Sequence, residues 1–291
     1  MVKSRRRLLS LAAAVLLLAV TAAGCGSANR SEPGGVQGTQ GTSGTSTGKD
    51  DTGEVKKIVV GTGTAFPNVC FIDENGKLTG FDVELVRIID ERLADYEFEF
   101  QTMEFSNLLI SLETKKIDFV AHQIEKNAER EQKYLFNKEP YAHWRNMIVV
   151  AKDNDSIKTL DDLKGKRVLV GATSAQAQIL ENYNKENNDA IEIVYRSGAA
   201  NDTVNQVITG RVEATLSADF SLSLIDPQGK LKMTGEQLSE ADILFTFRKD
   251  DPEAQQLADA VDVVIKELKA DGTLGKLSEE WLSSDFTADN K

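Results

Sequence analysis

Cysteine and histidine are scarce in this chain, and the local motifs of catalytic sites are missing. Two cysteines and two histidines occur among 291 residues, and they form no cluster with the spacing of metal ligands. The sequence also lacks a glycine-rich phosphate loop, an HExxH motif and a GxSxG motif. We therefore expect no metal, no cofactor and no catalytic residue.

The two cysteines are expected to have separate roles. Cys25 follows a run of small residues near the N-terminus, whereas Cys70 lies in the apolar segment VCFI at residues 69–72. If Cys25 serves as an anchor, Cys70 has no partner for an internal disulfide. We expect Cys70 to be a small, buried hydrophobic residue.

Basic residues are fewer than acidic ones, at 34 against 46, and the net charge is -12. Removing residues 1–24 would remove four basic side chains and no acidic ones, so the mature chain is more acidic still. Such a surface repels nucleic acid and anionic lipid headgroups and favours solubility. We expect no nucleic-acid partner.

Residues 1–24 have the composition of a secretory signal peptide. Basic residues at positions 3 and 5–7 precede an apolar run over residues 8–20. That run is shorter than the roughly 20 residues of a membrane span, so a plain transmembrane anchor is the weaker interpretation. Residues 4–6 also resemble the twin-arginine pattern, which leaves the export route open.

The small residues directly before Cys25 resemble the cleavage site of a bacterial lipoprotein signal, which implies an extracytoplasmic protein anchored to the cell membrane through a lipid on Cys25. Ala22 stands where such signals usually have leucine, and ordinary secretion is the alternative. Residues 25–54 are rich in Ser, Thr, Gly and Gln. Because they have almost nothing to bury, we expect a flexible linker that spans about 30 Å.

From about residue 55 onward, β-branched runs alternate with amphipathic segments, which predicts an α/β protein of one large domain or two lobes. Strands are expected at residues 57–61, 96–102, 117–121, 146–152, 166–171, 191–195, 212–216 and 243–248. Helices are expected at residues 81–93, 105–114, 160–163, 174–185, 202–209 and 253–269, with a last helix ending near Trp281.

Four segments resemble, in order, the polar amino-acid-binding proteins of bacterial ABC importers. They are GKLTGFDVEL at residues 76–85, LDDLKGKRV at 160–168, GRVEA at 210–214, and LKADGTL at 268–274 followed by Glu280-Trp281. By their order and spacing the chain is identified as a member of that family over residues 55–285. His122-Gln123 and the MTGE segment at 233–236 resemble the cystine-binding branch.

The resemblance implies a two-lobe periplasmic-binding-protein type II fold, with a mixed sheet flanked by helices in each lobe. Lobe 1 would comprise residues 55–141 plus 246–291, and lobe 2 residues 146–240. Crossover strands near residues 142–145 and 240–245 would form the hinge. The lobes would close around a small amino-acid-like ligand, with cystine favoured, and the closed monomer would dock on a membrane permease.

The resemblance also implies a set of ligand-binding residues. Arg130 would grip the ligand's carboxylate with two parallel hydrogen bonds, and Ser174 lies at a helix start, which suits anions. Phe66 would pack on the ligand's side chain, and Phe105 would pack on it from the opposite wall. The expected ligand-binding residues are Phe66, Phe105, His122, Gln123, Glu125, Arg130, Ser174 and Asp219.

The residues alone leave plainer interpretations open. Arg130 lies in a charged run at residues 129–133, and such runs usually face solvent. Phe66 and Phe105 could be ordinary core residues, and Ser174 could be a plain N-cap.

Three positions depart from the family pattern. Glu125 stands where the family usually has Ser or Thr, and Ala218 stands where it has the Asp that pairs with the ligand's ammonium, with Asp219 one residue later. Ala65 and Asn68 disturb the usual aromatic-proline segment. Glu125 could replace the missing acid, the ligand could be other than a simple α-amino acid, or Glu125 could point to solvent.

Two other classes of protein remain as alternatives. Some relatives of this fold resemble cyclohexadienyl dehydratase, and Glu125 with His122 could form an acid/base pair. No residue supplies a nucleophile, so we expect a binding protein and not an enzyme. A sensory domain would normally continue into a transmembrane helix, and the sequence stops at Lys291.

Overall fold

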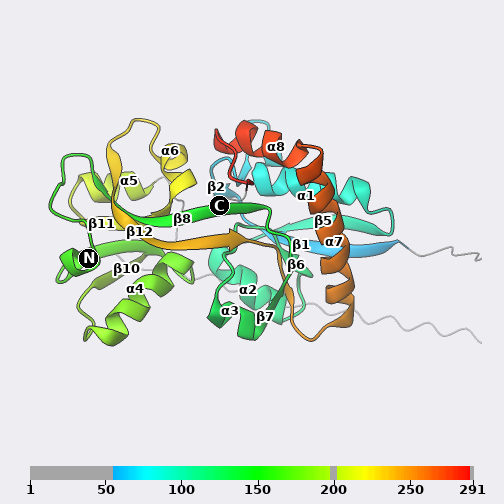
Figure 1. The fold of residues 1–291 in the computed structure, drawn as a ribbon, viewed down its shortest axis with the longest axis horizontal. Coiled ribbons are helices and arrows are strands. Elements are labelled where there is room, and N and C mark those ends of the chain that lie inside the picture. The colour runs from blue at the N-terminus through cyan, green and yellow to red at the C-terminus, as the bar shows by residue number, and fades with distance from the viewer. Residues whose placement is uncertain (1–54, 197–201, 289–291) are drawn as a thin grey trace, which may run out of the picture. The chain divides into compact units, whose positions relative to one another are not determined.

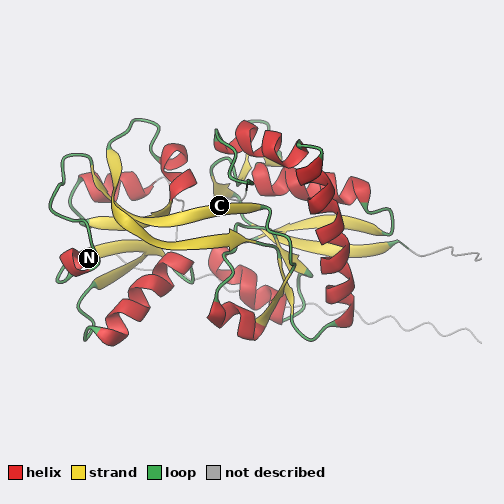
Figure 2. Ribbon diagram, viewed as in Figure 1, coloured by secondary structure: helices red, strands yellow, loops and turns green. Residues whose placement is uncertain are grey.

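The computed structural model describes residues 55–196 and 202–288. The predicted signal peptide, the linker and Cys25 lie outside the described residues. The described part contains two five-stranded mixed sheets with helices packed against them (Figures 1 and 2). The α/β class with one mixed sheet in each lobe is therefore confirmed. Within the described residues, no helix is both long enough and apolar enough to cross a membrane.

The first sheet has the strand order β5-β1-β6-β13-β7, and we call the part built on it lobe 1. Its strands are β1 (Lys56–Thr62), β5 (Tyr96–Thr102), β6 (Phe119–Val120), β7 (Tyr134–Phe136) and β13 (Thr246–Arg248). Its helices are α1 (Phe81–Arg92), α2 (Phe105–Glu113), α3 (Ala128–Lys133), α7 (Pro252–Ala270) and α8 (Thr273–Leu282). A small antiparallel sheet precedes α1 and consists of β2 (Ala65–Phe66), β3 (Cys70–Ile72) and β4 (Leu78–Thr79).

The second sheet has the strand order β10-β9-β11-β8-β12, and we call the part built on it lobe 2. Its strands are β8 (Ala142–Ala151), β9 (Arg167–Gly171), β10 (Glu192–Arg196), β11 (Ala214–Ala218) and β12 (Leu231–Ile243). Its helical segments are η1 (Asp161–Leu163), α4 (Ala175–Glu186), α5 (Asp202–Ile208), η2 (Asp219–Ser221) and α6 (Leu222–Ile225).

Strands β8 and β12 are the only two long strands that run side by side from one lobe to the other among the described residues (Figure 1). They pair antiparallel from Ala142 opposite Ile243 to Ala151 opposite Leu231. The register shifts between Thr234 and Ser239. The predicted hinge segments, residues 142–145 and 240–245, lie at the Ala142–Ile243 end of this pair, and the hinge stays a prediction.

The apolar side chains of each lobe form its core. Helix α1 buries Val83, Leu85, Val86 and Ile89 completely, in the stripe that the sequence predicts. Cys70 is also fully buried, as expected, and burial raises the pKa of its thiol to about 12. Each core residue of this size stabilises the fold by roughly 1.5–3 kcal/mol relative to an exposed one.

Strand Tyr96–Thr102 has its predicted bounds, and α1, α2, α4 and α7 begin and end within one residue of prediction. Helix α3 and the part of strand β12 before residue 240 were not predicted, for a shared physical reason. The helix sequence AEREQK has no apolar stripe, and β12 is an edge strand whose middle residues are mostly exposed. Neither segment therefore shows the apolar periodicity on which the prediction depends.

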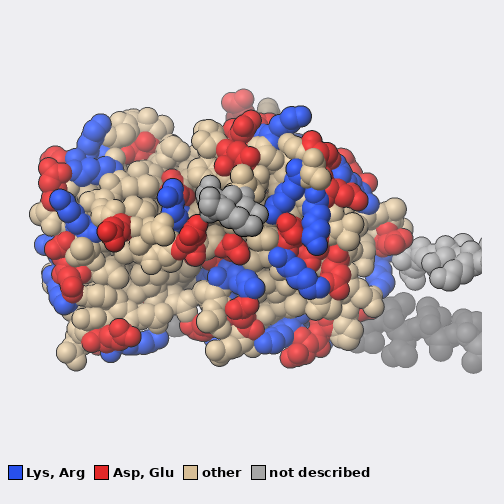
Figure 3. Space-filling model, in the orientation of Figure 1, with Lys and Arg blue, Asp and Glu red and all other residues tan. Residues whose placement is uncertain are grey.

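Acidic and basic side chains are interspersed over the face shown in Figure 3. Several of them form exposed ion pairs, such as Lys57 with Glu99 and Lys138 with Asp259. Exposed pairs of this kind contribute about 0–1 kcal/mol each. The fold therefore depends on its two cores and on its backbone geometry more than on these charges.

Gly80, the N-cap of α1, has a backbone conformation that only glycine adopts easily, with φ +118° and ψ 172°. A Cβ atom there would lie 2.5 Å from the Val69 carbonyl oxygen. We expect Gly80→Ala to lower the free energy of unfolding by roughly 3 kcal/mol. Gly76→Ala is the matched control, because Gly76 also has a positive φ, +79°, but no atom lies within 4 Å of an added Cβ. This substitution should lower the free energy of unfolding by about 1 kcal/mol. Urea unfolding measures both, and equal losses would contradict the steric argument.

Candidate functional site

A pocket of about 200 Å³ lies between the two lobes and is lined by residues of both. Lobe 1 contributes Phe66 from β2, Phe105 from the start of α2, and the segment that follows β6. Lobe 2 contributes the ends of β9, β10 and β11 and the start of α4. The carboxyl ends of neighbouring strands in α/β sheets are the usual place for a ligand, and the lining combines aromatic rings with a few charged and polar groups, as small-molecule sites do.

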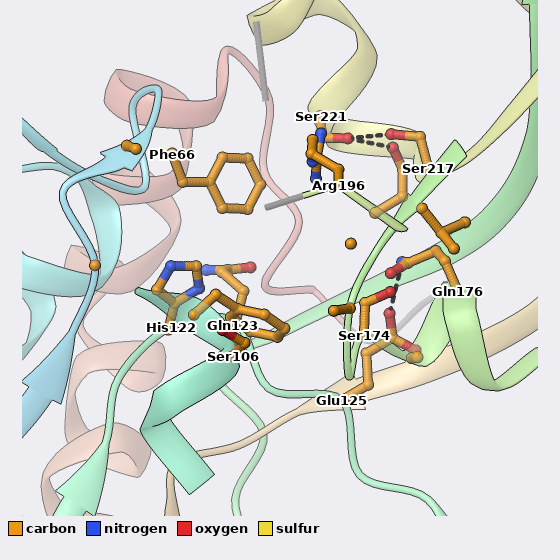
Figure 4. Close-up of a pocket in the computed structure, with 18 of the residues that line it drawn as sticks. Phe66, Ser106, His122, Gln123, Glu125, Ser174, Gln176, Arg196, Ser217 and Ser221 are labelled. Atoms are coloured by element: carbon orange, nitrogen blue, oxygen red, sulfur yellow. Dashed lines mark hydrogen bonds between the residues drawn. The ribbon is translucent and has the colours of Figure 1, made fainter. Parts of the chain in front are cut away.

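Aromatic rings form the lobe 1 wall of the pocket (Figure 4). The ring of His122 lies 4.9 Å from that of Phe105 and 6.0 Å from that of Phe66, between centroids. Burial lowers the pKa of His122 to about 4, so its imidazole is neutral at neutral pH. Gly63 lets the ring approach the backbone, because a Cβ there would lie 2.6 Å from Nε2. Phe66, Phe105 and His122 thus lie together at one wall, whereas the resemblance places Phe105 on the wall opposite Phe66.

Gln123 belongs to a buried polar cluster behind that wall. Its backbone N–H donates to Asp82 at 2.7 Å, its side-chain Nε2 donates to the same carboxylate, and Tyr141 Oη donates to it at 3.1 Å. The Oε1 atom of Gln123 is buried and has no partner among the described residues. Gln123 lines the pocket, so its carbonyl oxygen is an acceptor that a ligand can use.

Glu125 is buried at 6% exposure and lines the pocket, so the interpretation in which it points to solvent is wrong. Its Oε1 accepts hydrogen bonds from Trp144 Nε1 and Gln176 Nε2, both at 3.1 Å. Its Oε2 accepts from Asn146 Nδ2 at 3.0 Å. Burial raises the pKa of Glu125, and the hydrogen bonds and the charge of Arg130 oppose that rise.

Arg130 is buried at 7% exposure, so the interpretation in which it is a surface arginine is also wrong. Its Nη1 donates to the Glu125 carbonyl oxygen at 2.7 Å, and its Nη2 donates to the Thr173 carbonyl oxygen at 2.9 Å. Burial lowers the pKa of Arg130, although the nearby charge of Glu125 raises it. Each terminal nitrogen keeps a second hydrogen for a ligand.

Ser174 is the N-cap of α4, and its Oγ accepts from the Ala177 N–H at 3.0 Å. The N-cap role and the anion-binding role of Ser174 are therefore compatible, because the cap leaves other N–H groups of the first turn directed at the pocket edge.

Asp219 lies outside the pocket. It does not line the pocket, and its carboxylate accepts from Arg145 Nε at 3.0 Å.

Contacts across the cleft hold the lobes together. Asn127 Nδ2 donates to Gln178 Oε1 at 2.8 Å, and Gln178 Nε2 donates to Glu129. Two bonds described above also cross between the lobes: Arg130 Nη2 donates to the Thr173 carbonyl oxygen, and Gln176 Nε2 donates to Glu125 Oε1. The structure is therefore a closed arrangement in which helices α3 and α4 touch.

Sequence reasoning missed several residues that line the pocket. The most distinctive of them is Arg196, at the end of β10, whose Nη1 donates to Thr203 Oγ1 at 2.7 Å. Gln176 and the hydroxyls of Ser217 and Ser221 also line it. Each is an isolated polar residue with no motif around it, so the only available signal was its position after a predicted strand or at a predicted helix start. Within residues 55–196 and 202–288, no group of three acidic, histidine or cysteine side chains is placed to hold a metal.

Residues 58–284 match the bacterial extracellular solute-binding proteins, family 3. The chain belongs to this family. It is 48% identical over 236 residues to the L-cystine-binding protein TcyK of Bacillus subtilis, which covers 80% of this chain and 86% of the relative. The family assignment agrees with the resemblance predicted from the four sequence segments.

Solved structures of family 3 relatives agree. A putative L-cystine ABC transporter protein from Listeria monocytogenes is 48% identical, with a TM-score of 0.76, and covers 80% of this chain and 99% of that one. An ancestral arginine-binding protein bound to arginine is 32% identical, with a TM-score of 0.68, and covers 77% of this chain and 97% of that one. The two-lobe solute-binding fold is therefore shown.

The Asp82 carboxyl behind Gln123 is expected to make stability depend on pH. Burial raises its pKa to about 7, against 3.8 ordinarily, so between these values the folded state holds a proton that the unfolded state has lost. Raising the pH across this window therefore favours unfolding. Asp82→Asn removes this titration and serves as the reference. Relative to it, the free energy of unfolding of the wild type should fall by on the order of 2 kcal/mol from pH 5 to pH 7. Urea titrations measure it, and a constant difference would contradict the raised pKa.

Proposed function

We propose that this family 3 protein captures a zwitterionic amino acid between its lobes, with L-cystine favoured, and presents it to an ABC permease. The observation that carries the proposal is a buried carboxylate and a buried guanidinium, Glu125 and Arg130, lining one pocket. A zwitterion offers the complementary pair of charges. The names of the Bacillus and Listeria relatives support cystine as the ligand.

The ligand's carboxylate would bind where Arg130 faces the start of α4. The guanidinium has donors left over, and the first turn of a helix attracts an anion. Arg130 already joins the two lobes through Thr173. A carboxylate at this place would therefore contact both lobes and favour the closed form.

The ligand's ammonium would bind at Glu125. Ala218 lines the pocket with no charge to offer, and Asp219 is held by Arg145. Glu125 is therefore the acid that fills this role, from the side of the hinge. Phe66, Phe105 and His122 would cover the ligand's apolar middle. The side-chain Oε1 of Gln123 would accept a hydrogen bond from the ligand.

We propose a binding role without catalysis. His122 is neutral and packed between two phenylalanine rings, and both oxygens of Glu125 accept hydrogen bonds from neighbouring side chains. This arrangement supports a fixed binding wall in place of the acid/base pair considered above.

We also propose that residues 1–24 direct export, that Cys25 carries a lipid, and that residues 25–54 tether the lobes to the outer face of the cell membrane. A monomer suits this arrangement, because a hinged protein needs both lobes free to close. The extracellular character of the family supports export.

The ligand assignment is tested by thermal unfolding of the purified protein with L-cystine and a panel of amino acids. At a hundredfold excess over Kd, a bound ligand should raise Tm by about 5 to 10 °C. We expect this shift with L-cystine, and we expect Arg130→Met to weaken binding at least tenfold. Arg145→Met is the matched control, because Arg145 pairs with Asp219 outside the pocket. No shift with any amino acid would overturn the proposed ligand class, and unchanged affinity in Arg130→Met would remove Arg130 from the site.

The role of Glu125 is tested by the pH dependence of binding. If Glu125 holds an ammonium, protonating it weakens binding, so affinity should fall as the pH is lowered toward its pKa, which burial raises above 4.5. Glu125→Gln keeps the shape, should bind about tenfold more weakly at neutral pH, and should lose this pH dependence. Isothermal titration calorimetry measures both. The same pH slope in the variant would place the ammonium elsewhere.

A further inference from the structure

A second cationic group lies in the pocket, apart from the place assigned to the zwitterion. Figure 4 shows Arg196 with Ser217 and Ser221 at one end of the pocket, and Glu125, Ser174 and Gln176 at the other. Arg196 ends β10, opposite Gly171 at the end of β9. It therefore projects from the carboxyl edge of the lobe 2 sheet, where ligands of α/β proteins bind.

The Arg196 side chain is half-buried and makes no ion pair among the described residues. Its one hydrogen bond there is the 2.7 Å bond from Nη1 to Thr203 Oγ1. Burial lowers its pKa, and the charge of Asp202 opposes this without an ion-pair contact. Most of its five N–H donors have no protein partner, and because Arg196 lines the pocket they are available to an anion bound there.

The neighbours of Arg196 leave room for that anion. A Cβ atom on Gly171 would lie 3.5 Å from Arg196 Nη2 and 3.9 Å from Ser174 Oγ, so the glycine keeps the space between them open. Ser217 and Ser221 share a hydrogen bond of 2.6 Å, and Ser221 Oγ donates to the Ala218 carbonyl oxygen at 3.0 Å. Their remaining lone pairs are acceptors that suit an ammonium next to the anion.

We propose that Arg196 anchors a second carboxylate-binding subsite, so that the ligand carries a carboxylate at each end. The inference rests on the proposed amino-acid-binding function and deepens it. One zwitterionic end lies at Arg130 and Glu125, the apolar middle lies against the aromatic wall, and the second carboxylate meets Arg196. The pocket then selects a molecule with two amino-acid ends over one of similar length with a single end.

The test compares two disulfides that differ by one carboxylate, L-cystine and the mixed disulfide of L-cysteine with cysteamine. Isothermal titration calorimetry measures the affinity of each disulfide for three proteins: the otherwise wild-type chain, Arg196→Gln and the control Arg145→Gln. All three carry Cys25→Ser, so that the Cys25 thiol cannot exchange with the two disulfides. Cys70 is fully buried and is left unchanged. Wild type and the control should bind L-cystine roughly ten- to hundredfold more tightly than the mixed disulfide. Arg196→Gln should bind the two with nearly equal affinity.

A structural role for Arg196 predicts a different pattern. If Arg196 serves only to hold α5 through Thr203, Arg196→Gln and Thr203→Val should weaken both disulfides by the same factor. Equal weakening of both disulfides would overturn the proposal of a second carboxylate subsite and leave the proposed function intact. Equal affinity of the wild type for the two disulfides would have the same meaning. If wild type binds neither disulfide, the proposed ligand class fails and the subsite fails with it.

Discussion

The buried carboxylate of Glu125 joins the parts of the chain that must meet for the pocket to exist. It accepts from Trp144 and Asn146 on the hinge strand β8 and from Gln176 on lobe 2. Burying a carboxylate is unfavourable unless such bonds replace its water. Gln176 belongs to lobe 2, so one of the three hydrogen bonds to the Glu125 carboxylate crosses between the lobes.

Arg130 extends this constraint across the cleft. Its guanidinium holds the backbone of Glu125 in lobe 1 and the backbone of Thr173 in lobe 2. Because Arg130 is buried, each of these bonds is stronger than it would be in water. A ligand that supplies the opposite charges to both side chains therefore lowers the energy of the closed form more than that of an open one, which is the requirement for closure on binding.

Much of the fold was predictable because its core elements bury regular apolar stripes. Helix α1 and strand β5 were placed from periodicity alone, within one residue of their bounds. Helix α3 and strand β12 carry exposed, charged residues, so their structure comes from a capping bond and from pairing with β8. A sequence pattern cannot show such dependence on a neighbour far along the chain.

The sequence by itself determined the α/β class and the family, because these depend on periodicity and on segments that are contiguous in the chain. Only the tertiary structure decided which charges line the pocket. The residue pattern left open whether Glu125 and Arg130 face solvent and whether Asp219 reaches the pocket, and the structure buries the first two and pairs the third with Arg145. Arg196 has no motif, and it reaches the pocket because parallel strands end together at one edge of a sheet.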